Sequence, residues 1–145
     1  MLKTEGVLET CVYVDDMEQA HAFYHGVLGL ERMLEDGRLS AYDAGDRSVL
    51  LIFLRDEAIN DVETPGGLVP GHNSTGPAHF AFRVDAESLG RWKLHLEARS
   101  VRIVSEVDWG ARGKSIYFND PAGNVVELAT PRLWPNASAG DADPA

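Results

Sequence analysis

The sequence predicts an α+β domain of two β-α-β-β-β repeats, whose strands form a curved mixed sheet around a pocket with helices on the outer face. Two segments share one pattern and lie 70 residues apart: Glu9–Asp15 and His79–Asp85 each combine a possible metal ligand, an alternating strand and a closing Asp. An acidic residue, Glu127, lies inside the apolar run 125–129. A carboxylate in a buried strand is costly unless it is paired or bound to a metal. These observations predict a duplicated fold around a metal site.

The first repeat is expected over about residues 5–54. Polar and apolar residues alternate over 7–14, which is typical of a strand with one buried face. Asp15 is the predicted N-cap of the following helix, with Glu18 three residues later as its capping-box partner, and Gly29 ends that helix. Strands are then expected over 31–35, 38–44 and 48–54.

The second repeat is expected over about residues 77–130. A strand at 79–84 leads to a helix capped by Asp85, and strands follow at 101–107, 115–119 and 124–130. The last two form a hairpin across the turn 120–123. Residues 55–76 are rich in Gly and Pro and form a long linker or lid, and the tail 131–145 is predicted to be disordered after Trp134.

Strand parity assigns the second repeat's residues to two faces, because successive side chains of a strand point to opposite sides. The face toward the helix holds Phe80, Phe82, Val84, Ile116, Phe118, Val126 and Leu128. The opposite face holds His79, Ala81, Arg83, Ser115, Tyr117, Val125 and Glu127, and Glu9 takes the same side of its own strand. The possible metal ligands therefore face away from the helices.

Composition narrows the possible functions. A chain of 145 residues is expected to form one domain, and its net charge of −10 without a basic run argues against nucleic-acid binding. No apolar stretch reaches 18 residues, so no membrane span is predicted. Cys11 is the only cysteine, which favours the reducing cytoplasm. A small-molecule substrate is the expected partner.

Three segments carry a resemblance to a known family: VYVDDMEQAHAFYHGVLGL within 9–30, GPAHFAFRV at 76–84 and SIYFNDPAGNVVELAT at 115–130. They resemble the vicinal oxygen chelate superfamily, which includes glyoxalase I, metal-dependent fosfomycin-resistance enzymes, extradiol dioxygenases and bleomycin-resistance proteins. The helix end FYHGVLGL and the ending DPAGNVVEL are together specific for the superfamily, but they do not identify the reaction.

The resemblance implies that Glu9, His79 and Glu127 are metal ligands, because metal-using members take one ligand from the corresponding strands. The strand 48–54 offers no fourth ligand, which departs from glyoxalase I, and Glu9 stands where the three-ligand enzymes usually have His. Two carboxylates and one imidazole favour Mn²⁺ or Mg²⁺, and Zn²⁺, Ni²⁺ and Fe²⁺ stay open. The alternative for Glu127 is a structural ion pair with Arg83.

Further candidates would act on the substrate. The catalytic candidates are Glu127, Tyr117 and His72: the resemblance assigns Tyr117 to substrate contact, and His72 is a possible lid ligand or general base. The substrate-binding candidates are Tyr117, Ser115, Arg83 and Arg112. An anionic substrate would suit Arg112, whereas a solvated surface position is the ordinary role of such an arginine.

The function predicted from these residues is metal-dependent lyase, isomerase or transferase chemistry on a small molecule with neighbouring oxygens, with the metal as Lewis acid. Two alternatives stay open: an Fe(II) ring-cleaving dioxygenase, and a metal-free drug-binding protein of the bleomycin-resistance kind. The resemblance also implies a homodimer with shared sites, in which Glu9 of one subunit faces His79 and Glu127 of the other.

Overall fold

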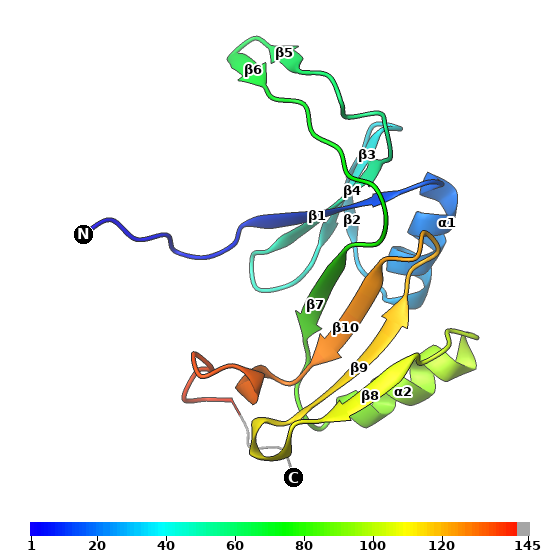
Figure 1. The fold of residues 1–145 in the computed structure, drawn as a ribbon, viewed down its shortest axis with the longest axis vertical. Coiled ribbons are helices and arrows are strands. Elements are labelled where there is room, and N and C mark those ends of the chain that lie inside the picture. Colours follow the sequence, from blue (N-terminus) through cyan, green and yellow to red (C-terminus); the bar gives the residue numbers. More distant parts are fainter. Residues whose placement is uncertain (142–145) are drawn as a thin grey trace. The chain divides into compact units, whose positions relative to one another are not determined.

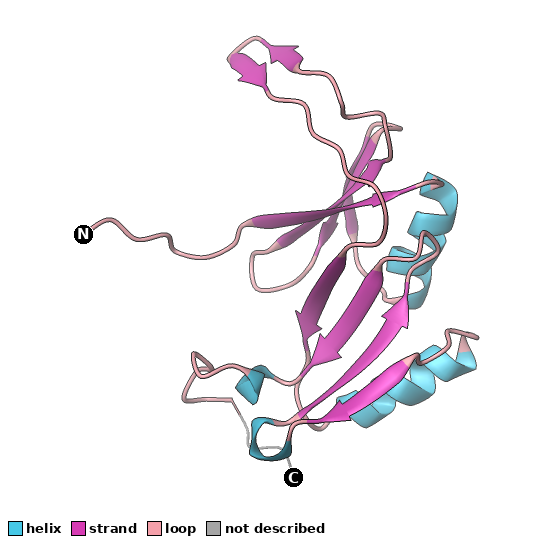
Figure 2. Ribbon diagram, in the orientation of Figure 1, coloured by secondary structure: helices cyan, strands magenta, loops and turns pink. Residues whose placement is uncertain are grey.

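The computed structural model describes residues 1–141, which form two compact units, Met1–Pro77 and the part of the chain from Ala78 onward. Each unit contains a β-α-β-β-β repeat that builds its own mixed four-stranded sheet (Figure 1), and the first unit has a small hairpin in addition. Helices are few beside the strands (Figure 2). The predicted α+β class and the duplicated plan are therefore confirmed.

The first sheet contains the strands β1 (Glu9–Val14), β2 (Arg32–Glu35), β3 (Leu39–Asp43) and β4 (Val49–Leu54), in the order β1-β4-β3-β2. The pair β1–β4 is parallel and the other pairs are antiparallel. Buried on one face of this sheet are Val12, Val14, Tyr42, Leu50 and Ile52. Tyr13, Ala41 and Phe53 are buried on the other face, so burial does not simply alternate along the strands as the sequence pattern predicts. Apolar burial on this scale is the main source of stability for such a sheet.

The first helix starts one residue later than predicted. The N-cap of α1 (Met17–His21) is Asp16, whose Oδ1 accepts a hydrogen bond from the backbone N of Gln19 at 3.0 Å. Asp15 instead pairs with Arg55, with 2.9 Å between Oδ1 and Nε. The chain continues as a π-helix, Ala22–Val27, and then reaches Gly29 with φ 75°, a left-handed conformation that suits glycine and ends the helix as predicted.

The linker at 55–76 is more ordered than a plain loop. It contains a small hairpin, β5 (Val62–Thr64) and β6 (Gly67–Val69). Backbone N of His72 donates to O of Ala58 at 2.7 Å, which closes the base of this excursion. A side chain at Gly71 would collide with the backbone of Ile59, because a Cβ built there lies 2.0 Å from the Ile59 carbonyl oxygen. The glycine thus allows the two limbs to approach closely.

The second sheet contains β7 (His79–Arg83), β8 (Ser105–Asp108), β9 (Lys114–Asn119) and β10 (Val125–Ala129), in the order β7-β10-β9-β8. The strand predicted over 101–107 begins later, at Ser105. Ser100 has a left-handed φ of 59°, and backbone N of Val101 still donates to O of Leu96 at 2.9 Å. The helix end therefore holds the first of these residues, and contact with the sheet begins where backbone N of Val104 donates to O of Tyr117 at 2.8 Å.

The helix α2 (Leu89–Ala98) also begins later than predicted, and Ser88 rather than Asp85 is its N-cap. Asp85 closes the preceding turn, because its Oδ1 accepts from backbone N of Ser88 at 2.7 Å, and this bond lowers the pKa of the Asp85 carboxyl. Lys93 on α2 pairs with Glu106 on β8, so the helix packs beside this strand (Figure 1). Leu89 and Leu96 supply its buried side chains.

The hairpin β9–β10 carries the turn that the sequence predicts. The Asp120 carboxylate accepts from backbone N of Ala122 at 2.9 Å and of Asn124 at 2.9 Å, and from Nδ2 of Asn124 at 2.8 Å. Gly123 has φ 89°, which glycine adopts easily. Oδ1 of Asn124 in turn accepts from backbone N of Ala78 at 2.9 Å. This buried network fixes the start of β7 against the turn before β10.

The chain after β10 is a folded segment as far as the description extends. A 3₁₀ turn covers Pro131–Leu133, and backbone N of Ala137 donates to O of Trp134 at 3.2 Å. The disorder predicted after Trp134 is therefore wrong for residues 135–141, and residues 142–145 lie outside the described part. Among residues 1–141, no helix combines the length and the apolar character needed to cross a membrane.

Candidate metal and substrate site

The strand register of the second unit brings three predicted site residues together. Glu127 on β10 lies directly across from Tyr117 on β9 and from Ala81 on β7, and His79 lies across from Val125. Residues two apart on a strand share a face, so His79, Tyr117 and Glu127 point to the same side of the sheet. The parity prediction placed them there. The ring centroids of His79 and Tyr117 are 6.1 Å apart.

The hydrogen-bond pattern of His79 prepares one nitrogen for a cation. Its Nδ1 lies 3.0 Å from the carbonyl oxygen of Val125. A carbonyl only accepts, so Nδ1 carries the hydrogen, and Nε2 of the neutral ring keeps a lone pair. Nε2 lies 3.3 Å from Oε1 of Glu127. A lone pair facing a carboxylate is unfavourable unless the ring is protonated or a cation binds both atoms.

The Glu127 carboxylate is buried and only partly satisfied by hydrogen bonds, as is expected of a metal ligand in the absence of its metal. Its side chain is only 7% exposed, against 52% for that of His79. Its Oε2 is buried and finds no hydrogen-bond partner among residues 1–141. A buried, unpartnered carboxylate oxygen is expensive. The pair therefore fits a divalent ion, and the carbonyl of Val125 supplies the outer hydrogen bond that usually orients a ligating histidine.

A directed chain of hydrogen bonds leads to Tyr117. Indole Nε1 of Trp109 donates to Oγ of Ser115 at 2.9 Å, and that hydroxyl donates to the hydroxyl oxygen of Tyr117 at 3.3 Å. Indole nitrogen can only donate, so Ser115 accepts this bond and keeps its own hydroxyl hydrogen for the bond to Tyr117. The hydroxyl hydrogen of Tyr117 is consequently left to donate to another group on the same face of the sheet.

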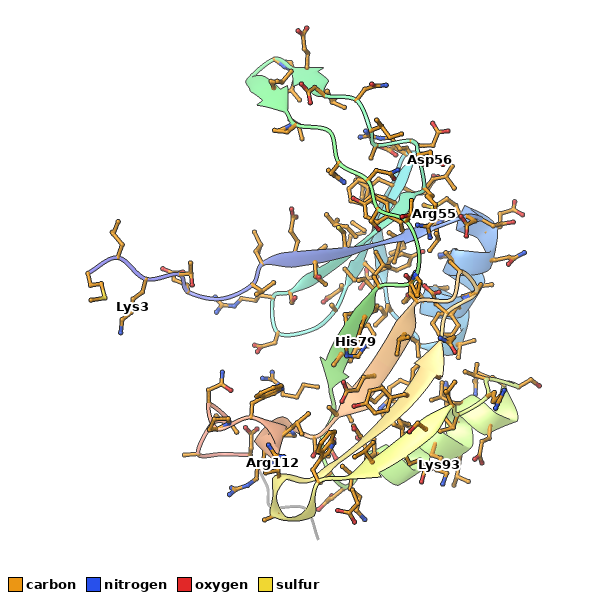
Figure 3. The ribbon with its side chains drawn as sticks, in the orientation of Figure 1. Lys3, Arg55, Asp56, His79, Lys93 and Arg112 are labelled. Atoms are coloured by element: carbon orange, nitrogen blue, oxygen red, sulfur yellow. The ribbon has the colours of Figure 1, made fainter. Side chains whose placement is uncertain are left out.

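These residues border a cavity of about 670 Å³ in the second unit, within the usual range for small-molecule sites. Five predicted residues line it: His79, Arg83, Arg112, Tyr117 and Glu127. Ser115 does not line the cavity; it is buried, and its hydroxyl is hydrogen-bonded to Trp109 and Tyr117. Figure 3 shows His79 at the start of β7 and Arg112 on the connection before β9.

Two aromatic side chains at this cavity were absent from the sequence-based prediction. Trp109 and Trp134 both line it, together with part of the segment 131–141. The only sequence signal for a role in binding was their residue type, because a large indole in a polar connection or tail is not expected to pack in the hydrophobic core. Their placement depends on folding of the tail, which local composition did not predict.

The remaining predicted residues, Glu9 and His72, belong to the first unit. Glu9 is exposed at the start of β1, and on the same face of that strand lie Cys11 and Tyr13. The hydroxyl of Tyr13 is hydrogen-bonded to Nδ1 of His72, whose ring meets that of Phe53 edge-on with centroids 4.5 Å apart. Burial raises the pKa of the Tyr13 hydroxyl and of the Cys11 thiol, and the nearby Glu9 charge adds to the latter shift. Within residues 1–141, no three His, Cys, Asp or Glu side chains gather into a metal-binding group.

Comparison with known proteins identifies the family. The model of the glyoxalase/bleomycin resistance protein/dioxygenase superfamily matches residues 6–128, which is most of the chain. The chain belongs to this superfamily. Among solved structures, the chain is similar to a lactoylglutathione lyase from Agrobacterium tumefaciens. The two are 35% identical with a TM-score of 0.82, over 91% of this chain and 98% of that one.

One further relative and one further solved structure are similar to the chain. The metallothiol transferase FosB of Staphylococcus epidermidis is 28% identical over 134 residues, which cover 91% of this chain and 86% of the relative. The fosfomycin resistance protein FosX of Listeria monocytogenes, solved with Mn(II) and sulfate, is 18% identical with a TM-score of 0.65, over 88% of this chain and 91% of that one. A likeness at that identity shows the shared fold alone.

Proposed function

We propose that this protein is a metal-dependent enzyme that acts on a small molecule with two neighbouring oxygens, by lyase, isomerase or transferase chemistry. The observation that carries the proposal is the pair formed by His79 and Glu127. In the neutral ring Nε2 of His79 keeps its lone pair beside the Glu127 carboxylate, and a buried oxygen of that carboxylate has no partner among the described residues. The names of the lactoylglutathione lyase and the metallothiol transferase support this reaction type over ring cleavage.

In this proposal His79 and Glu127 hold the ion through Nε2 and the carboxylate, and Glu9 is the third predicted ligand. A bound divalent ion supplies Lewis-acid stabilisation of negative charge that develops on the substrate oxygens. Tyr117 binds a substrate oxygen, because its hydroxyl accepts from Ser115 and so has its own hydrogen free to donate. The carboxylates of Glu127 and Glu9 are the candidates to accept a substrate proton, and His72 stays a predicted general base.

The proposed assembly is a homodimer with shared sites, in which Glu9 of one subunit joins His79 and Glu127 of the other. Closed two-fold dimers are the commonest homo-oligomers, and such symmetry would give two equal sites. Two carboxylates and one imidazole favour Mn²⁺ or Mg²⁺, and Zn²⁺, Ni²⁺ and Fe²⁺ are the alternatives.

The test is the metal content of gently purified protein, measured by mass spectrometry, beside the variants His79→Ala and Glu127→Ala. We expect close to one metal ion per chain in the unaltered protein and loss of it in both variants. Matched controls are His95→Ala and Glu97→Ala, which remove the same residue types from α2. No uptake of any divalent ion would contradict the proposal and favour a metal-free binding protein, and bound iron would favour a dioxygenase.

The shared site has a separate arm in the same assay. Glu9→Ala and Glu127→Ala chains are unfolded together and refolded as a mixture. If sites are shared, half of the randomly mixed dimers contain one intact site, so roughly a quarter of the wild-type metal content returns. A site built within one chain would leave every chain in the mixture defective. Recovery of no metal would therefore contradict the shared arrangement.

A further inference from the structure

The far end of the cavity has walls that take no part in the proposed metal pair. One wall is the connection between β8 and β9, with Trp109 and Arg112. The other is the segment after β10, with Pro131, Leu133 and Trp134. These groups differ in character from the polar end of the cavity, because they offer two indole rings and a guanidinium.

The indole ring of Trp109 is held in place by a hydrogen bond to a buried side chain. Its Nε1 donates to Oγ of Ser115 at 2.9 Å, and Ser115 is itself only 1% exposed. The guanidinium carbon of Arg112 lies 5.6 Å from the centroid of the Trp109 ring, a cation–π arrangement that orients the planar group. Among residues 1–141, no carboxylate forms an ion pair with Arg112. Its N–H donors therefore stay available to an anion.

Trp134 is 67% exposed although it lines the cavity. An exposed indole of this size gains substantially from covering a flat apolar group, and its ring prefers an offset or edge-on aromatic neighbour. Asp141, the acidic residue at this end, has Oδ2 engaged with backbone N of Ser138 at 2.7 Å. The far end thus offers two indole rings and a guanidinium, beside polar residues of the tail and one carboxylate that is engaged with the backbone.

The strand register shows how far this end lies from the metal pair. Ser115, which anchors Trp109, pairs with Ala129, and Ala129 lies two residues along β10 from Glu127. At about 3.4 Å per residue, the two rows are roughly 7 Å apart. A substrate that spans both ends must therefore be longer than a three-carbon molecule.

We propose that the far end binds an aromatic ring with a carboxylate, which the Trp109 and Trp134 rings flank and Arg112 pairs. Only one part of this inference rests on the proposed function, namely that the neighbouring oxygens of the same substrate lie at His79 and Glu127. The substrate class is accordingly a flat aromatic acid whose reactive oxygens are separated from its carboxylate by about the length of one ring. An arginine with no ion pair selects the anion and rejects a cationic ligand.

The experiment first uses metal-free protein, so that its result does not depend on the metal site. Binding of naphthoate, and of the neutral naphthalenemethanol, is measured by quenching of tryptophan fluorescence and by calorimetry. We expect naphthoate to bind more tightly than the neutral compound, and Arg112→Gln to weaken naphthoate by about tenfold without affecting naphthalenemethanol. Trp134→Ala weakens both compounds, because they share the ring. Arg102→Gln, an exposed arginine away from the cavity lining, is the control and leaves both unchanged.

The second arm uses protein loaded with Mn²⁺ and compares mandelate with a mandelate that carries a second carboxylate on its ring. We expect the second carboxylate to tighten binding in the unaltered protein and to lose that advantage in Arg112→Gln. Equal binding of naphthoate and naphthalenemethanol, or no effect of Arg112→Gln on naphthoate, would overturn the inference. Failure of the metal proposal shows instead as absence of Mn²⁺ uptake while naphthoate still binds, so the two failures are distinct.

Discussion

The two sheets share one topology and differ at corresponding positions. In each unit the first strand pairs in parallel with the last, and Glu9 opposite Val49 corresponds to His79 opposite Val125. Two residues further along the last strand, the first sheet has Leu51 where the second has Glu127. Across the next antiparallel pair, Ala41 stands where the second sheet has Tyr117.

The difference shows why one face is filled and the other is hollow. On the first sheet Tyr13, Phe53 and Ala58 form a buried cluster, with Leu39 and Leu51 packed against it. On the second sheet the matching face carries an ionisable pair and a hydroxyl beside a cavity of about 670 Å³. The two sheets have equivalent strand pairings, so the backbone does not account for the difference between these faces. The proposed chemistry therefore depends on a few side chains, and the fold supplies their placement.

The largest effect is expected when the second sheet is made like the first by Glu127→Leu. Metal affinity falls by more than about 100-fold, because loss of an outer partner alone typically costs 10–100-fold and here a ligand is lost. The metal-free protein keeps or gains thermal stability, since a buried carboxylate with an unpartnered oxygen is replaced by an apolar side chain. Calorimetric metal titration and thermal unfolding measure the two effects.

The reciprocal change Leu51→Glu is the control for that comparison. It buries a carboxylate beside an apolar cluster and lowers the free energy of unfolding by about 2 kcal/mol or more, with no gain of a metal site. A variant Glu127→Leu that is clearly less stable than the metal-free wild type would show that Glu127 has a structural partner, and would weaken the metal assignment.

A smaller effect is expected at the turns that precede the last strand of each unit. Asp120 is 4% exposed and accepts three hydrogen bonds, so Asp120→Ala lowers the free energy of unfolding by about 2–4 kcal/mol. Asp43 is exposed and its carboxylate accepts from backbone N of Gly45 at 2.8 Å, so Asp43→Ala costs about 1 kcal/mol or less. Urea denaturation measures both, and equal losses would contradict the contrast.

The smallest effect concerns the two helical segments. His21 stacks on His25 with 4.8 Å between ring centroids, and burial, then the charges of Arg32 and His25, lower the pKa of His21. The unfolded chain therefore binds more protons at this residue than the folded one. The contribution of the neutral His21 to the stability of the folded protein is fully present above an ordinary histidine pKa of about 6.5. It declines as the pH falls below that value.

His21→Gln should accordingly flatten the fall in thermal stability below about pH 6.5. The control is His95→Gln, which removes an imidazole from α2 in the second unit. Thermal unfolding from neutral to mildly acidic pH provides the measurement. An unchanged slope in His21→Gln would show that protonation of this ring does not oppose folding.

Much of the fold could be predicted because its signals are local. Alternation located β1, β4, β7, β9 and β10 to within about two residues, and parity placed His79, Tyr117 and Glu127 on one face. The helix starts were wrong because Asp15 and Asp16, or Asp85 and Ser88, are equally suitable caps by residue type. Only the paths of the chain, with Asp15 drawn to Arg55 and Asp85 closing a turn, decided between them.

By itself, the sequence determined the duplicated β-α-β-β-β plan and the residue types that suit a metal, because periodicity and spacing are properties of neighbouring residues. The tertiary structure alone decided that the Val125 carbonyl takes the Nδ1 hydrogen of His79 and that one oxygen of Glu127 is left without a partner. It also decided that Trp109 and Trp134 line one cavity. Such contacts join residues far apart in the chain, so they depend on register and on folding of the tail, which no local pattern specifies.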